Sequence, residues 1–178
     1  MTLGQKALDG LNGFLIQLET GKPIKATEVR RVDTPDGPMH IRRETTLGGD
    51  KMQKELEDKF LEKWPTWFAG LHDGDPRETC LAFGFECSDG WNDLLWRLCE
   101  DIEKLGPGED FRVEQVKEKF GGLRFYTSGT NTEVFNRITE AENESYKTCE
   151  FCGSKEDVTS TGSWVTTRCK SCREKKNA

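Results

Sequence analysis

The sequence predicts an α+β protein with a small central domain and an appended module at each end. An amphipathic helix and a two-strand pattern occupy residues 1–47, which form a helix-plus-hairpin module. Residues 50–147 combine helical periodicity with a Gly-Gly hairpin signal and form a central α+β domain. Two Cys-x-x-Cys pairs in residues 148–178 predict a C-terminal zinc ribbon.

The N-terminal module is predicted to begin with a helix that ends at Gly21. Strands are expected over residues 24–32 and 39–46, joined by Thr34-Pro35-Asp36-Gly37. Proline presets one backbone dihedral of that turn and glycine accepts a positive one. The helix is indicated by leucines at helical spacing, with Phe14 beside them: Leu8, Leu11, Leu15 and Leu18.

This first module resembles the leading segment of some phage and antitoxin-type helix-turn-helix regulators. The resemblance lies in the Gly4-Gln5 start, the amphipathic helix and Thr34-Pro35-Asp36-Gly37-Pro38. No helix-turn-helix follows, so the resemblance implies no DNA-reading part in this chain. Four arginines of the hairpin can contact phosphate, although a solvated face is the simpler interpretation: Arg30, Arg31, Arg42 and Arg43.

The central domain is predicted to contain three helices. One runs over residues 51–64 and ends at Pro65, and the last covers residues 132–147. The middle helix follows Ser88 and Asp89 and has a broad apolar face: Trp91, Leu94, Leu95, Leu98, Ile102 and Leu105. Trp64, Trp67 and Phe68 form an aromatic cluster that we expect in the core, with a ligand-stacking platform as the alternative.

The segment from Val116 to Tyr126 predicts a β-hairpin with Gly121-Gly122 as its two-residue turn, because both turn positions need positive φ. This register places Phe120 opposite Leu123. One face is then apolar and suits the core: Val116, Phe120, Leu123 and Phe125. A helix through Val113, Val116 and Phe120 is the competing secondary structure.

The other face of the predicted hairpin is basic and carries one aromatic ring: Lys117, Lys119, Arg124 and Tyr126. In this register Lys119 lies directly opposite Arg124, and such a like-charge pair costs stability that a bound anion would relieve. These four residues are the candidates for contact with phosphate or nucleic acid. The alternative is an ordinary solvated face.

The two cysteine pairs are Cys149 with Cys152 and Cys169 with Cys172, separated by sixteen residues. A separation of ~15–20 residues is typical of a four-cysteine zinc site. Four thiolates complete a tetrahedral shell and leave no position for an activated water, so the predicted Zn²⁺ is structural. Two disulfides or four unrelated thiols are the alternatives.

Composition and charge limit the class of protein. No run approaches the ~20 apolar residues of a membrane span, and residues 1–20 lack a signal-peptide pattern, so we expect a cytoplasmic protein, in which disulfides are rare. The net charge of −6 argues against a general nucleic-acid coat. Residues 47–112 hold sixteen acidic and eight basic residues, whereas residues 148–178 hold four acidic and six basic residues.

Residues 72–89 are the one place where the sequence suggests catalysis. Carboxylates beside a histidine can perform acid–base chemistry or hold a hard cation, although a solvated acidic loop is the default interpretation. A second metal bound by His72 and free cysteines, including Cys99, is a weaker hypothesis. The candidate side chains are His72, Asp73, Asp75, Glu78, Cys80, Glu86, Cys87 and Asp89.

Taken together, the segment Lys119-Phe120-Gly121-Gly122-Leu123-Arg124-Phe125-Tyr126, the glutamate-rich helix, Cys149-Glu150-Phe151-Cys152-Gly153, a tryptophan and the last Cys-x-x-Cys resemble one family. The family comprises uncharacterised zinc-ribbon proteins of tailed bacteriophages and prophages. The resemblance covers roughly residues 60–172. It implies a phage accessory protein with a structural zinc, acting in the host cytoplasm, and it implies no catalytic residue.

Three functions follow as hypotheses. The first is a non-enzymatic accessory protein that binds nucleic acid or a host or defence nucleoprotein through the hairpin and ribbon. The second is a protein-directed counter-defence inhibitor, similar to an anti-CRISPR factor, whose acidic central domain occupies a basic nucleic-acid channel. The third is a metal-dependent enzyme that uses the 72–89 loop.

Overall fold

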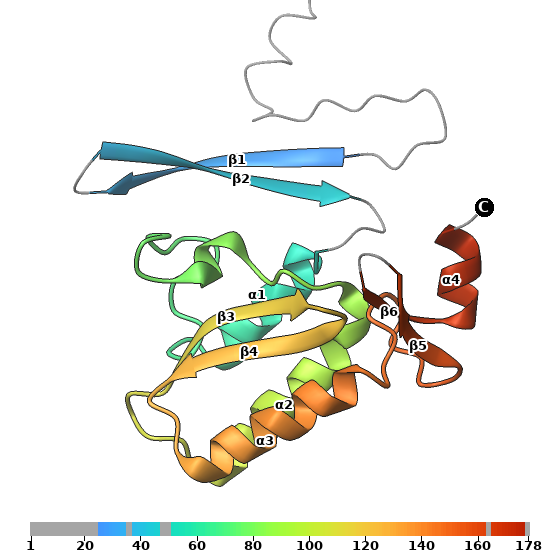
Figure 1. Cartoon of the computed structure of the whole chain (residues 1–178). Helices are drawn as coiled ribbons and strands as arrows, with labels where there is room; N and C mark the ends of the chain where they lie inside the picture. Colours follow the sequence, from blue (N-terminus) through green and yellow to red (C-terminus); the bar gives the residue numbers. More distant parts are fainter. Residues whose placement is uncertain (1–24, 35–36, 47–50, 163–164, 177–178) are drawn as a thin grey trace, which may run out of the picture. The chain divides into compact units, whose positions relative to one another are not determined.

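The computed structural model describes residues 25–34, 37–46, 51–162 and 165–176 and divides into two compact units, residues 1–49 and 50–178 (Figure 1). In the first unit, β1 (Lys25–Thr34) pairs antiparallel with β2 (Gly37–Thr46). The register runs from Lys25 opposite Thr46 to Thr34 opposite Gly37, which confirms the predicted hairpin. The predicted helix over Leu8–Leu18 and the residues Pro35 and Asp36 lie outside the described residues.

The second unit contains helices and two two-stranded antiparallel sheets, which confirms the α+β class. Residues 148–178 belong to the same compact unit as residues 50–147. None of the helices that the structure describes is both long and apolar enough to cross a membrane. The elements are α1 (Lys54–Lys63), the 3-10 turns η1 (Cys80–Phe83) and η2 (Asp89–Trp91), α2 (Asn92–Leu105), β3 (Arg112–Lys119), β4 (Gly122–Ser128), α3 (Thr132–Ser145), β5 (Val158–Thr161), β6 (Thr166–Cys169) and α4 (Lys170–Lys176).

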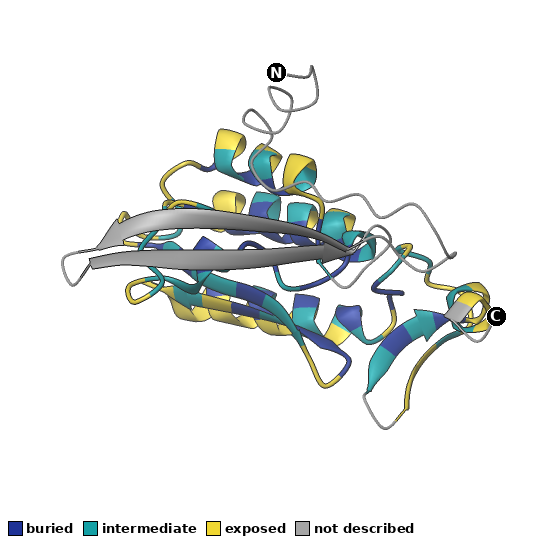
Figure 2. Cartoon of the chain, turned by 90° about the horizontal axis from the view of Figure 1, so that it is seen from above, coloured by how far each residue is buried: buried dark blue, intermediate teal, exposed yellow. Residues whose placement is uncertain are grey.

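Figure 2 marks the buried residues that form the core of the second unit, and the largest of their side chains are aromatic. Phe60 of α1 lies at its centre, with ring centroids 5.2 Å from both Phe85 and Trp96 and 5.6 Å from Phe68. Trp64 stacks on Trp67 at 5.7 Å. Large aromatic side chains bury much apolar area each, so few of them fill a small core. The predicted core role of this aromatic cluster is therefore confirmed.

Helix α2 buries the apolar face that its sequence predicts, except for Leu105 at its C-terminal end, which is 37% exposed. It ends at Gly106, whose φ of +64° is the left-handed conformation that glycine adopts without strain. Helix α3 packs beside it, and its own inner face closes the lower side of the core (Figure 1). The buried residues of the two helices are Leu94, Leu95, Leu98, Cys99, Ile102, Val134, Ile138, Ala141 and Ser145.

The predicted hairpin exists, but its predicted register is wrong by one residue. Strands β3 and β4 pair Lys119 with Gly122, so the turn is Phe120-Gly121, with φ values of +54° and +78°. The predicted core position of Phe120 is also wrong, because 73% of this residue is exposed. The competing helix through Val113 and Phe120 does not form.

The register has an identifiable cause outside the hairpin. A Cβ atom on Gly122 would lie 2.4 Å from the ring of Tyr146, which follows α3. Glycine inside a strand often marks the close approach of another group. Gly122 is therefore needed as a strand residue beneath this ring, and the turn moves one residue toward the N-terminus.

Both outer edges of the β3–β4 hairpin are hydrogen-bonded to the rest of the domain. Along β3, the Glu86 N–H donates to the Val116 carbonyl at 2.9 Å and the Glu86 carbonyl accepts from the Glu118 N–H at 2.8 Å. Along β4, the Leu123 N–H donates to Ser145 Oγ at 2.8 Å, and the Phe125 N–H donates to a Glu142 carboxylate oxygen at 3.1 Å. These bonds occupy backbone groups that an edge strand otherwise leaves open.

The register predicts opposite outcomes for two phenylalanines. Phe120→Asn should leave the free energy of unfolding within about 0.5 kcal/mol of wild type or raise it, because asparagine followed by glycine suits a two-residue turn with positive φ. Phe125→Ala should lower it by about 3–5 kcal/mol, because Phe125 is buried. Urea unfolding measures both values, and a large loss for Phe120→Asn would contradict the register.

Candidate metal centre and basic hairpin face

The structure brings the four predicted cysteine ligands together at the C-terminal end of the second unit. Cys149 and Cys152 lie on the turn after α3, Cys169 ends β6, and Cys172 lies in the first turn of α4. Their four Sγ atoms all lie within 4.8 Å of one another. Cys152 Sγ and Cys169 Sγ are 3.6 Å apart, much farther than the ~2.05 Å of a disulfide.

This arrangement fits one tetrahedral metal ion. Thiolate–zinc bonds of ~2.3 Å place the sulfurs of a regular tetrahedron about 3.8 Å apart, close to the spacing found here. Cys149 and Cys169 are buried and Cys152 is exposed, so the centre lies at the protein surface with one open side. A complete shell of four thiolates binds a metal tightly but offers it no substrate position.

Local hydrogen bonds shape both cysteine turns. In the first, the Gly153 N–H donates to the Cys149 carbonyl at 2.9 Å, and the Cys149 N–H donates to the Ser154 carbonyl at 2.8 Å. In the second, the Ser171 hydroxyl, 3.2 Å from the Cys169 sulfur, lowers the pKa of Cys169 to about 6. Burial raises the pKa of the Cys152 thiol, and it raises the pKa of Cys172 to about 12, so metal binding at neutral pH releases protons from these ligands.

The first cysteine turn docks on the start of α2. The Gly90 N–H donates to the Glu150 carbonyl at 2.8 Å, and the Glu150 carboxylate accepts from the Ser88 N–H at 3.2 Å. The Trp91 indole N–H donates to the Thr148 carbonyl at 2.9 Å. Because Glu150 is buried, these bonds compensate for its desolvation.

Gly90 permits this close contact. A Cβ atom at this position would lie 2.5 Å from the carbonyl oxygens of Cys149 and Glu150 and 2.6 Å from the Cys152 nitrogen. All three atoms belong to the backbone and cannot rotate away. The sequence analysis missed Gly90, because an isolated glycine before a helix carries no sign of what it approaches.

The ribbon also contacts the tip of the β3–β4 hairpin. The Thr167 hydroxyl of β6 donates to the Gly121 carbonyl and is buried. A Cβ atom at Gly121 would lie 2.9 Å from the side chain of Val165. The metal centre and the hairpin are thus joined by a direct contact between β6 and the hairpin turn.

The four predicted contact residues of the hairpin share its outward face. Lys117 lies directly opposite Arg124, not Lys119, which instead pairs with Gly122. Tyr126 is 41% exposed, and Lys117 Nζ lies 5.5 Å from the centroid of its ring. Neither Lys117 nor Lys119 forms an ion pair with any residue in the described ranges.

Arg124 is held in place by α3 and the residue after it. Its guanidinium donates to the Tyr146 hydroxyl at 3.1 Å, a bond that raises the pKa of Arg124, and the Glu142 carboxylate lies 3.8 Å away. Tyr146 therefore belongs to the outward face together with Tyr126. The sequence analysis missed Tyr146, although Gly122 inside a predicted hairpin was a sign of close approach.

The carboxylates of residues 72–89 do not converge. Asp75 pairs with Arg77 at 2.8 Å, and this contact lowers the pKa of Asp75. Glu86 accepts from the Gln115 amide at 2.9 Å, and Asp89 accepts from the Gln53 N–H at 2.7 Å.

The histidine and free cysteines of the second-metal hypothesis are also apart. His72 lies 3.1 Å from Glu57, which is buried. Burial raises the pKa of the Cys87 and Cys99 thiols, so both are neutral at neutral pH. Within residues 51–162 and 165–176, the four ribbon cysteines are the one group of three or more potential ligands that gathers in space.

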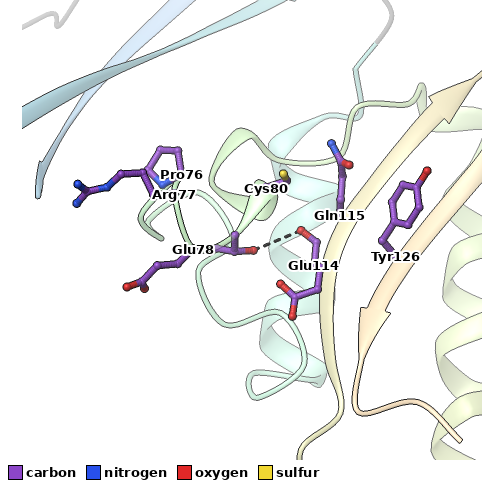
Figure 3. Close-up of a pocket in the computed structure, with 8 residues that line it drawn as sticks. Pro76, Arg77, Glu78, Cys80, Glu114, Gln115 and Tyr126 are labelled. Atoms are coloured by element: carbon purple, nitrogen blue, oxygen red, sulfur yellow. Dashed lines mark hydrogen bonds between the residues drawn. The ribbon is translucent and has the colours of Figure 1, made fainter.

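A shallow pocket of about 190 Å³ lies beside the basic face, between residues 76–80 and the hairpin (Figure 3). Tyr126 and Gln115 line one side of it and are cross-strand partners. Thr79 also lines the pocket, and its hydroxyl donates to the Glu114 carbonyl at 3.3 Å. Glu78 and Cys80 line the opposite side.

No protein-family model matches the sequence, and neither the curated proteins nor the solved structures that were compared contain a match to it. The metal centre and the hairpin face are therefore the features that bear on function.

Loss of one thiolate should empty the metal centre. Cys149→Ser should reduce bound metal from one per chain to well below one and lower the thermal midpoint, because metal binding contributes folding free energy. Cys80→Ser is the matched control, since Cys80 is half-buried and outside the cluster. Elemental analysis of the purified proteins gives the ratio. An unchanged ratio in Cys149→Ser would show that the cluster binds no metal.

Substitution of Gly90 should destabilise the docked cysteine turn. Gly90→Ala should cost about 1–3 kcal/mol in urea unfolding, because its methyl group meets three backbone atoms. Gly108→Ala adds the same methyl group where no atom lies within 4 Å, and it should change stability by less than about 0.5 kcal/mol. Equal stabilities of the two variants would contradict the docking contact.

Proposed function

We propose that this chain is a non-enzymatic, zinc-binding accessory protein that binds nucleic acid, or a nucleoprotein through its nucleic acid, with the outward face of the β3–β4 hairpin. The sequence resemblance supports a phage or prophage origin and action in the cytoplasm of the host cell.

Zinc is the ion favoured by the ligand set. Tetrahedral sites of four thiolates select zinc or iron–sulfur chemistry, and two Cys-x-x-Cys turns separated by sixteen residues follow the spacing of zinc ribbons. Its role is structural, because the four cysteines fill the coordination shell and the cysteine turn supports the start of α2. The metal acts by holding the ribbon against the hairpin.

The observation that carries the nucleic-acid proposal is the direct opposition of Lys117 and Arg124 across the hairpin. Like charges facing each other on one side of a sheet destabilise it, and a phosphate between them removes that cost. Lys119 lies on the same face and is exposed. Phosphate contacts by such side chains supply most of the affinity of nucleic-acid binding that is not sequence-specific.

The acidic surface of the second unit gives weaker support to a protein-directed inhibitor, because several of its carboxylates are already paired. Glu100 contacts Lys63 at 2.9 Å, and Asp101 contacts Arg137 at the same distance. Internal pairing leaves less negative charge to occupy a basic channel on another protein. We therefore treat a protein-directed inhibitor as an alternative outcome of the binding experiment described next.

The test compares two double variants with the same change in charge. Lys117→Gln/Lys119→Gln should weaken binding to a labelled oligonucleotide and reduce the slope of log K against log salt by about 0.7–0.9 for each lost phosphate contact. Lys59→Gln/Lys104→Gln, at two exposed lysines of α1 and α2, should leave both quantities near wild type. Fluorescence anisotropy between 50 and 200 mM salt, roughly the range over which such affinities fall steeply, measures them.

Two results would overturn the proposal. One is the absence of binding to any DNA or RNA at the lowest salt concentration. The other is an equal loss of binding in both double variants. Capture of a stoichiometric host protein after nuclease treatment, together with the first result, would replace the proposal with a protein-directed inhibitor.

A further inference from the structure

We infer that the nucleic acid recognised by the hairpin face is single-stranded, with one unpaired base stacked on Tyr126 and directed into the pocket between residues 76–80 and β3. This inference rests on the proposed function and names the form of nucleic acid that the same face accepts.

The occupied edges of the hairpin disfavour a duplex. A two-stranded β-ribbon reads double-stranded DNA by entering the major groove, which is about 12 Å wide. Here the edge of β3 is bonded to Glu86 and the edge of β4 to Ser145 and Glu142. The hairpin is flanked on both sides and offers its outward face alone, across which a flexible single strand can lie.

That face alternates aromatic rings with cations, as single-strand binding surfaces do. Arg124 lies between Tyr126, two residues along β4, and Tyr146, whose hydroxyl it contacts at 3.1 Å. Lys117 lies opposite Arg124 and beside the Tyr126 ring, 5.5 Å from its centroid. A base stacked on the exposed Tyr126 ring thus places its phosphate within reach of both cations.

The pocket beside Tyr126 has the polarity expected for a base. Glu78 and Glu114 line it and repel phosphate, and the Glu114 carboxylate accepts from the Ser128 hydroxyl at 2.7 Å. Gln115 stands next to Tyr126 on the same face (Figure 3), and its amide is fixed by the bond to Glu86 at 2.9 Å. The pocket is a shallow surface depression of about 190 Å³, the scale of one planar base.

The test uses the full chain with bound metal, a labelled single-stranded oligonucleotide and the matching duplex at one salt concentration. The single strand should bind more tightly than the duplex. Tyr126→Leu should weaken single-strand binding roughly 5- to 160-fold, because stacking of a base on an aromatic ring is worth about 1–3 kcal/mol. Tyr126→Phe should keep most of the affinity, since the ring and not the hydroxyl carries the stacking.

Phe135→Leu is the matched control, because Phe135 is an exposed aromatic residue of α3 outside the hairpin and the pocket lining. Its affinity should equal that of wild type. Oligonucleotides with abasic sites should bind wild type more weakly than intact oligonucleotides do. Tyr126→Leu should bind both kinds of oligonucleotide with the same affinity.

The results separate this inference from the proposed function. Duplex binding as tight as single-strand binding, or an unchanged affinity in Tyr126→Leu, would overturn the inference while the hairpin remains a nucleic-acid contact. Failure of every oligonucleotide to bind would overturn both.

Discussion

The contact between the first cysteine turn and the start of α2 is the constraint on which the second unit depends. Three backbone atoms of the turn lie where a side chain at residue 90 would be, and Glu150 is buried against Ser88. These bonds also fix Trp91, which lies immediately before α2 and is fully buried in the core. The geometry of the metal ligands and the packing of the core are therefore set by the same few residues.

A second contact connects the ribbon to the turn of the hairpin. Thr167 of β6 is bonded to the carbonyl of Gly121, so the ribbon holds the hairpin turn in position. The strand edges are held by Glu86 on one side and by Ser145 and Glu142 on the other. A face fixed on three sides keeps Lys117 and Arg124 opposed even though their charges repel, which preorganises them for an anion.

Much of this architecture follows from local sequence signals. The apolar stripe of α2 repeats with the period of a helix, and the two cysteine pairs are separated by a fixed interval. The helix and the metal cluster could therefore be predicted. The hairpin could be predicted as an element, but Phe120-Gly121 and Gly121-Gly122 satisfy the same local turn rule. The choice between them depends on Tyr146, which follows a helix more than twenty residues away, and on Thr167 in the ribbon. In the sequence, the only sign of a long-range contact of this kind is an isolated glycine.

The docking glycine has a consequence for how such proteins diversify. A ribbon exchanged onto another central domain would need a residue without a side chain at the equivalent of Gly90 and N–H donors at the equivalents of Ser88 and Trp91. Its buried glutamate would otherwise lose hydrogen bonds that compensate for its desolvation, at a cost of several kcal/mol for a charged group. Recombination between genes would thus tend to transmit the central domain and the ribbon as one inherited unit.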